Sequence, residues 1–168
     1  MIKVNDVYNM DCMEGIKLLE DKSIDLVIID PPYKLELNKI RNTNKFNKYT
    51  KELMDLKDGF DLKVLDLLIP KMKKINIYIY CSKRQIKDLI DYFINVGCNY
   101  EILTWHKLNP SPLTNNNYLP DTEYIVFARE KGVKLYGNYY TKKKYYISGV
   151  NQIDKRKYKH PTIKPLPF

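Results

Sequence analysis

The chain has 168 residues, of which 44% are apolar, and this is enough for one domain with a hydrophobic core. It carries 29 Lys and Arg against 20 Asp and Glu, and the resulting net charge of +9 favours a polyanionic partner. The three cysteines, at positions 12, 81 and 98, indicate neither a disulfide framework nor a zinc site. No signal peptide or long apolar run is visible, so we expect a soluble, cytoplasmic protein without a bound metal.

The first half of the chain is predicted to alternate between strands and helices. In chain order we expect a strand at 2–9, a helix at 11–19, a strand at 25–29, a mobile polar loop at 34–60 and a helix at 60–74. Asp11 and Glu14 have the spacing of a capping box, which opens the first helix. Pro70 is expected to shorten or bend the last one.

The second half continues this alternation. We expect a strand at 76–80, a helix at 83–96 that ends at Gly97, and strands near 100–105 and 122–128. Strands that alternate with helices of this length predict an α/β fold with a largely parallel sheet. Cys81 and Cys98 are expected to be small buried residues of this fold.

The most informative junction follows the strand at 25–29. There the apolar run ends in Asp30-Pro31-Pro32-Tyr33. An acid, two prolines and an aromatic ring form a rigid ledge with one hydrogen-bond acceptor and one stacking face. This combination suits a planar group with an exocyclic amine, such as adenine or cytosine removed from a base stack. The alternative interpretation is a plain strand-ending turn, which Asp and Pro also favour.

This tetrapeptide resembles the catalytic motif of DNA amino-methyltransferases, which move a methyl group from S-adenosylmethionine to adenine N6 or cytosine N4. The resemblance implies that the Asp30 carboxylate and the Pro31 carbonyl accept hydrogen bonds from the target amine and stabilise its developing positive charge. Pro31 and Pro32 keep the ledge rigid. Tyr33 would stack on the extruded base.

Two further segments follow the permuted branch of that family, in which the catalytic half precedes the cofactor half. Asp11-Cys12-Met13-Glu14 is similar to its opening segment, and His160-Pro161-Thr162-Ile163-Lys164-Pro165 resembles its H-P-T-x-K-P element. The resemblance implies that Asp11, Cys12, Thr162 and Lys164 bind S-adenosylmethionine. Asp11 could equally act only as a helix cap, and residues 160–165 could be an ordinary linker.

The segments between these motifs also resemble the family in type and place. Residues 80–82 correspond to a strand end that lines the target pocket, and residues 105–110 to a loop near the flipped base, although Trp105 could simply be core. Residues 123–129 are interpreted mainly as sheet scaffold. Tyrosines and lysines interleave along 130–158, which fits a small DNA-contacting, target-recognition insertion or a solvated basic loop.

The resemblance therefore predicts one α/β domain over residues 1–168: the catalytic half of a Rossmann-like, S-adenosylmethionine-dependent methyltransferase sheet. The glycine-rich turn that holds the cofactor in the family has no counterpart, because the six glycines never occur in a G-x-G spacing. We expect a truncated gene product, a split enzyme completed by a second chain, or a fragment. On each of these readings the chain alone is expected to be inactive.

The predicted function is site-specific methylation of double-stranded DNA, as in restriction–modification. Asp at position 30 favours adenine N6, because cytosine-N4 relatives of the permuted branch often carry Ser there. Cytosine N4 remains the alternative target. The alternative function is a basic remnant that binds DNA without chemistry.

Overall fold

The computed structural model describes residues 2–34, 59–112, 116–158 and 164. Its strands are β1 (Val27–Ile29), β2 (Asn76–Cys81), β3 (Asn99–Lys107), β4 (Thr122–Arg129) and β5 (Tyr145–Ser148). Its α-helices are α1 (Cys12–Lys17), α3 (Lys63–Leu68), α4 (Ile86–Asn95) and α5 (Gln152–Tyr158). A 3-10 turn, η2 (Ile69–Lys71), follows α3. The predicted loop at 34–60 falls almost entirely outside the described residues.

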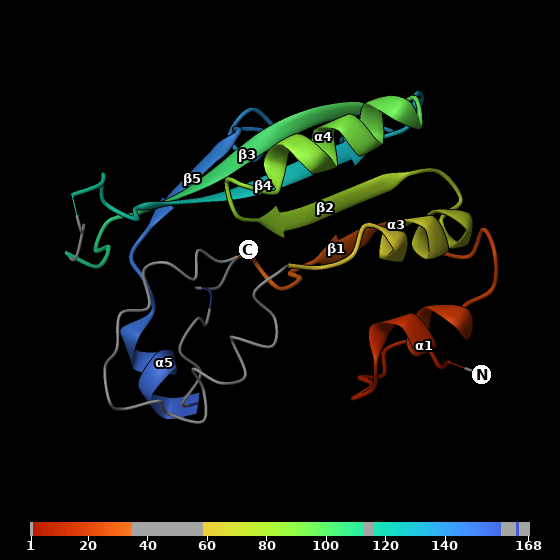
Figure 1. Ribbon diagram of the computed structural model, residues 1–168, viewed down its shortest axis with the longest axis horizontal. Coiled ribbons are helices and arrows are strands. Elements are labelled where there is room, and N and C mark those ends of the chain that lie inside the picture. Colours follow the sequence, from red (N-terminus) through yellow and green to blue (C-terminus); the bar gives the residue numbers. More distant parts are fainter. Residues whose placement is uncertain (1, 35–58, 113–115, 159–163, 165–168) are drawn as a thin grey trace.

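The strands form one mixed sheet in the order β1-β2-β4-β3-β5 (Figure 1). β1 runs parallel to β2, and β5 runs parallel to β3. β4 lies between β2 and β3 and runs antiparallel to both. The expectation of a largely parallel sheet was therefore wrong, because β4 enters the sheet centre in the opposite direction. The α/β architecture itself is confirmed.

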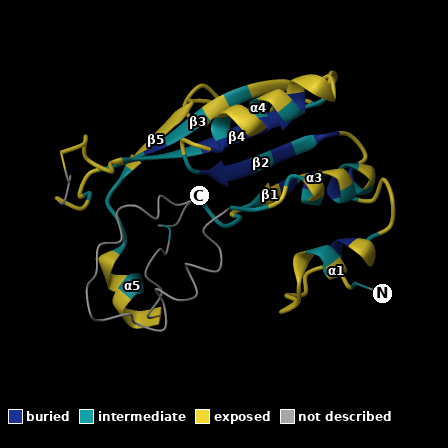
Figure 2. Ribbon diagram, in the orientation of Figure 1, coloured by how far each residue is buried: buried dark blue, intermediate teal, exposed yellow. Residues whose placement is uncertain are grey.

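The hydrophobic core lies between the sheet and the helices α3 and α4. β2 is almost wholly buried in Figure 2, and its residues Ile77 and Ile79 have no exposed surface. α4 packs against β3 and β4 through Leu89 and Phe93, which are also fully buried. The apolar stripe on α4 explains this placement, since one helix face carries the large side chains and the other is polar.

The sequence predicted a strand at 2–9 that the structure does not contain. Val4 and Val7 are 88% and 98% exposed, so neither side chain finds a core to pack against. Asn5 has a φ of 65°, which breaks an extended backbone. A strand requires a neighbour, and within the described part of the chain no strand pairs with residues 2–9.

The helix predictions were more accurate. Asp11 caps α1, because its carboxylate accepts from the backbone N–H groups of Met13 and Glu14 at 2.8 and 3.3 Å. Pro70 ends the regular part of the predicted 60–74 helix, which tightens into η2. Gly97 follows α4 with a φ of 77°, a conformation that favours glycine. Cys81 and Cys98 are buried, as expected.

Part of the predicted insertion at 130–158 belongs to the sheet. β5 lies in its middle and extends the sheet beyond β3, and α5 follows it. Tyr136, Tyr139 and Tyr140, which precede β5, are strongly exposed.

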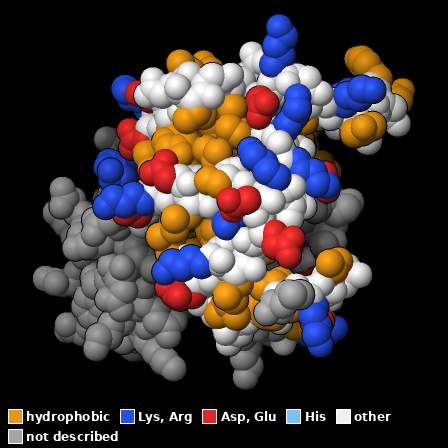
Figure 3. Space-filling view, turned by 90° about the vertical axis from the view of Figure 1, so that its right-hand side faces the viewer, with side chains coloured by type: hydrophobic (Ala, Val, Ile, Leu, Met, Phe, Trp, Pro, Cys, Tyr) orange, Lys and Arg blue, Asp and Glu red, His pale blue; other side chains and the backbone are white. Residues whose placement is uncertain are grey.

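Figure 3 shows the molecule turned so that the right-hand side of Figure 1 faces the viewer. Lys and Arg side chains there alternate with Asp and Glu around apolar patches, so the positive charge is not concentrated on that face. Within the described residues, no helix combines the length and apolarity that crossing a membrane requires.

Phe93→Ala tests the packing of α4. Removing this fully buried ring should lower the free energy of unfolding by about 3–5 kcal/mol, because a cavity remains in the core. Ile94→Ala, one position along the helix and 52% exposed, is the matched control and should cost less than about 1 kcal/mol. Urea unfolding followed by circular dichroism measures both; equal losses would contradict the described orientation of α4.

Candidate active site

The direction of the strands brings four chain segments to one edge of the sheet. β1, β2 and β3 run in the same direction, so their carboxyl ends meet at this edge. β4 runs the opposite way, so it contributes its beginning instead. Asp30 follows β1, Tyr80 lies near the end of β2, Lys107 ends β3 and Glu123 lies near the start of β4.

The Lys164 ammonium lies at the centre of this cluster. Its Nζ forms an ion pair with Oδ2 of Asp30 and lies 3.9 Å from Oε2 of Glu123. The same atom lies over the ring of Tyr80, 4.5 Å from its centroid, and 5.9 Å from that of Tyr33. Carboxylates and aromatic faces both attract a cation, so this is a preformed cation-binding position.

Glu123 joins the remaining charged groups. Its Oε1 atom pairs with Lys107 Nζ at 2.7 Å, and its Oε2 atom accepts a hydrogen bond of 3.3 Å from the Tyr33 hydroxyl. The Lys107 ammonium also lies 5.2 Å from the centre of the Trp105 ring. Two acids and two lysines thus balance in charge, as partly buried ions require.

The phenol of Tyr33 stays protonated in this setting. Burial, followed by the nearby negative charges of Glu123 and Asp30, raises the pKa of Tyr33 well above its ordinary value. The same causes raise the pKa of Tyr80. Tyr33 therefore acts as a neutral hydrogen-bond donor with a fixed ring. Burial also raises the pKa of the Cys81 thiol, at the end of β2, to about 11, so that thiol is not a nucleophile near pH 7.

Gln85 fixes the second proline of the ledge. Its side-chain amide donates to the Pro32 carbonyl at 3.1 Å, while its oxygen accepts from the backbone N–H and hydroxyl of Ser82 at 2.9 and 2.8 Å. Gln85 is only 6% exposed. A Cβ added to Gly59, whose φ is 79°, would lie 2.8 Å from this amide, so a larger residue cannot approach it there.

A cavity of about 390 Å³ adjoins the cluster. It has Trp105, Lys107 and Glu123 on its sheet side. The loop after β3 and the start of α5 complete it with Asn109, Pro110, Ser111, Pro112, Pro120, Val150, Gln152 and Lys155. Its lining thus mixes Trp105 and prolines with charged and polar side chains, and its volume lies at the lower end of the range for small-molecule sites. Glu123 and Lys107 belong to both the cavity and the charged cluster.

Comparison with known proteins relates the chain to methyltransferases. No protein-family profile matches it. It is 26% identical over 131 residues to the type II methyltransferase M1.MboII of Moraxella bovis, covering 76% of this chain and 46% of that protein. It is 25% identical to the type II methyltransferase M2.MboI of the same organism, covering 96% of this chain and 67% of that protein.

Solved structures give the fold. The crystal structure of the M1.HpyAVI–SAM complex superposes with a TM-score of 0.61 at 24% identity, over 89% of this chain and 66% of that one. The structure of M1.HpyAVI alone gives a TM-score of 0.57 at 22% identity, over 84% and 64%. This is a methyltransferase-like α/β fold. The chain spans about half the length of M1.MboII and about two thirds of the others.

Within this methyltransferase-like fold, the predicted catalytic residues form one group. Asp30 and Tyr33 share Lys164 and Glu123 as neighbours, and Gln85 anchors Pro32. Lys164 was predicted to contact the cofactor. In the structure its ammonium forms an ion pair with the predicted catalytic residue Asp30. Thr162 lies outside the described residues.

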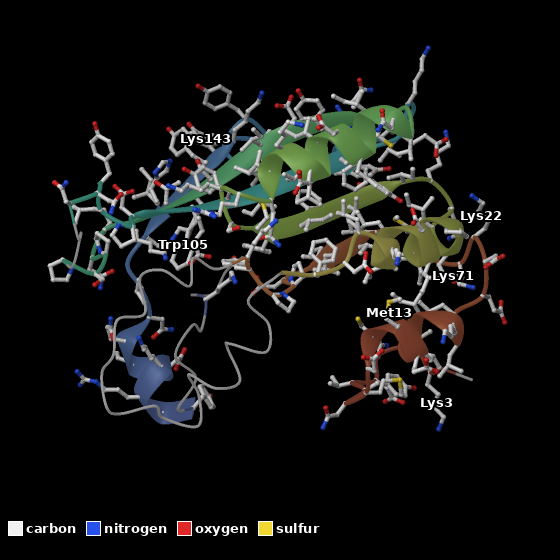
Figure 4. The ribbon with its side chains drawn as sticks, viewed as in Figure 1. Lys3, Met13, Lys22, Lys71, Trp105 and Lys143 are labelled. Atoms are coloured by element: carbon white, nitrogen blue, oxygen red, sulfur yellow. The ribbon has the colours of Figure 1, made fainter. Side chains whose placement is uncertain are left out.

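The predicted cofactor residues Asp11 and Cys12 are not brought to this cluster by any described contact. The Asp11 carboxylate is engaged in capping α1, and Cys12 is exposed. Figure 4 places Met13, on the same helix, at the opposite end of the molecule from Trp105. A role for Asp11 and Cys12 in binding a cofactor stays a prediction.

Sequence reasoning missed Glu123 and Gln85 as site residues, and it placed Lys107 near the site only as part of the 105–110 segment. Glu123 was interpreted as scaffold because it opens an ordinary apolar strand. Gln85 has no motif around it, since it follows two charged residues before α4. A signal for Glu123 did exist: a charged residue at the start of an otherwise buried strand is uncommon without a partner.

Gln85→Met should destabilise the fold by about 1–3 kcal/mol, because the Pro32 carbonyl and the Ser82 N–H lose their partner while the volume is nearly kept. Lys87→Met, on the exposed face of α4, is the control and should change the free energy of unfolding by less than about 0.5 kcal/mol. Guanidinium unfolding measures both. If Gln85→Met left the free energy of unfolding unchanged, the Gln85 amide would not be needed to hold the ledge.

Proposed function

We propose that this chain is the catalytic segment of a site-specific DNA methyltransferase of the permuted branch, acting on the exocyclic N6 amine of a flipped adenine. The observation that carries the proposal is the cluster of Asp30, Tyr33 and Glu123 at one sheet edge, of which Glu123 also lines a cavity of about 390 Å³. Similarity to type II methyltransferases supports it. This function requires access to DNA, so the proposed location is the cytoplasm.

The ledge would bind the target amine through two acceptors. Asp30 is 50% exposed and therefore open to a ligand, while Gln85 already occupies the Pro32 carbonyl. The Asp30 carboxylate and the Pro31 carbonyl would accept from the two amine protons. They would thereby favour a pyramidal nitrogen and stabilise the positive charge that develops on it. Tyr33, held by Glu123, would provide the stacking surface for the base.

The site also fits a cationic methyl donor. S-adenosylmethionine, when bound, supplies an electrophilic methyl group on a positively charged sulfur. The described cluster already holds one cation between two carboxylates and two tyrosine rings. Because two lysines already balance the two acids, Asp30, Tyr33 and Tyr80 would face the positive sulfur only once the Lys164 ammonium has moved away from Asp30. That a second chain supplies the glycine-rich half of the cofactor site stays a prediction.

DNA phosphates would meet the basic residues around α5. Its last turn contains Lys155, Arg156 and Lys157. Before it, Lys143 lies 5.7 Å from the ring centres of both Tyr140 and Tyr145. Cations that hold phosphates beside exposed aromatics are common in nucleic-acid interfaces.

Methyl transfer to DNA tests the proposal directly. The chain, alone and together with a second chain that carries a glycine-rich cofactor turn, is incubated with tritiated S-adenosylmethionine and genomic DNA that lacks methylated adenine. Nucleoside mass spectrometry should find N6-methyladenine. N4-methylcytosine would move the target to cytosine. The chain alone is expected to be inactive, so the sample with both chains decides: DNA binding without any methyl transfer there would favour the non-catalytic remnant and contradict the proposal.

Asp30→Ala should lower the rate of methyl transfer by at least about 100-fold, because it removes a preorganised acceptor at the reacting nitrogen. Affinity for DNA should remain nearly unchanged in a gel-shift assay, since phosphate contacts dominate binding. Asp91→Ala, on the exposed face of α4, is the matched control. An Asp30 variant with normal turnover would exclude the proposed role.

Tyr33→Ala should weaken capture of the flipped base by about 1–3 kcal/mol, the usual contribution of base–aromatic stacking. The fluorescence of 2-aminopurine at the target position, in a duplex carrying the site mapped by methylation, reports this capture. Tyr33→Phe keeps the ring and loses only the hydroxyl that Glu123 accepts. It should therefore retain most of the signal, and equal losses in both variants would argue against stacking.

A further inference from the structure

The Lys164 ammonium has two carboxylates within reach. It contacts Asp30 and lies 3.9 Å from Oε2 of Glu123, and its side chain is only 20% exposed. Movement of Nζ by a small rotation of the last side-chain bonds would exchange the closer acid for the more distant one. The faces of Tyr80 and Tyr33 border this path.

The two acids differ in how open they are. The Asp30 side chain is 50% exposed, and that of Glu123 is 20% exposed. Glu123 is also held on both oxygens, by Lys107 on one and by the Tyr33 hydroxyl on the other. An incoming ligand therefore reaches Asp30, whereas Glu123 remains fixed behind it.

The proposed reaction places a conflict on Asp30. The target amine needs this carboxylate as an acceptor, but the Lys164 ammonium is already paired with its Oδ2 atom. An ammonium left beside a nitrogen that develops positive charge would oppose the reaction, since like charges repel strongly in a partly buried site. Lys164 therefore has to move without leaving its charge unpaired.

We propose that Glu123 is a positioning residue that retains the Lys164 ammonium when the target amine takes Asp30. This inference rests on the proposed function for its purpose, and on the geometry of the three side chains for its physical content. Glu123 thereby clears the acceptor and keeps Tyr33 oriented at the same time. It also keeps the cation close to Asp30, ready to return when the product leaves.

Competitive acetylation of lysines tests this hand-over without DNA or cofactor. The full chain is labelled briefly with an acylating reagent, and the rate at Lys164 is read by mass spectrometry after digestion. Asp30→Asn imitates the loss of that acid to the amine. In this variant Lys164 should stay within about threefold of its wild-type rate, because Glu123 takes over the ion pair.

The double variant Asp30→Asn/Glu123→Gln removes both acids. Lys164 should then react about tenfold faster than in the wild type, because no carboxylate any longer holds its ammonium. If Asp30→Asn alone reaches that rate, Glu123 does not retain the ammonium and the inference is wrong. Should the double variant unfold, the single variant still decides, with the rate of the exposed Lys3 as the reference for a free amine.

Lys144 provides the matched control. It pairs with Glu101 across the sheet in the described structure. The single substitution Glu101→Gln should therefore be enough to speed the acetylation of Lys144, whereas Lys164 requires the loss of both of its acids. Lys71, paired with Asp21 and 18% exposed, should keep its rate in every variant and so reports that the fold is intact. Because the measurement uses neither DNA nor a methyl donor, a failed methyl-transfer assay and a failed hand-over are separate results.

Discussion

The site depends on the direction of one strand. β4 runs against both of its neighbours, so its first residues, rather than its last, lie where β1, β2 and β3 end. Glu123 consequently stands beside Trp105 in the sheet register and faces the segment that follows β1. A parallel β4 would place this carboxylate at the far edge of the sheet. Asp30, Lys164 and Lys107 would then lack the second acid that balances their charge.

That charge balance explains why so many ionisable groups tolerate partial burial here. Glu123, Lys107 and Lys164 are each about four-fifths covered, and each has an oppositely charged partner. Removing one member leaves another unpaired, which is costly in a medium of low polarity. Asp30, at the open side, is the acid whose partner can change at the least cost. The geometry therefore separates a fixed acid from an exchangeable one.

The local features of this arrangement were predictable from sequence, and the long-range ones were not. An apolar run ending in Asp30-Pro31-Pro32-Tyr33 specifies its own geometry, because proline restricts the backbone regardless of context. The buried stripe of α4 and the cap at Asp11 are local for the same reason. Strand direction is different, since it depends on which distant strand a segment pairs with. The error about the parallel sheet and the failure to recognise Glu123 therefore have a common origin. Residues 2–9 show the same dependence: they were predicted as a strand, but no strand in the described part of the chain pairs with them.

The pairing of β5 with β3 fixes the middle of the 130–158 segment to the scaffold. The Trp105 indole donates to the Ser148 hydroxyl at 2.8 Å. Residues 104–107 of β3 pair one by one with residues 145–148 of β5, which fixes the register of β5. The exposed tyrosines before β5 and the basic helix α5 after it are thus both attached to one strand of the sheet. Substitutions in either of these flanking segments would leave the distance from β5 to the Glu123 cluster unchanged, because β5 is fixed to β3.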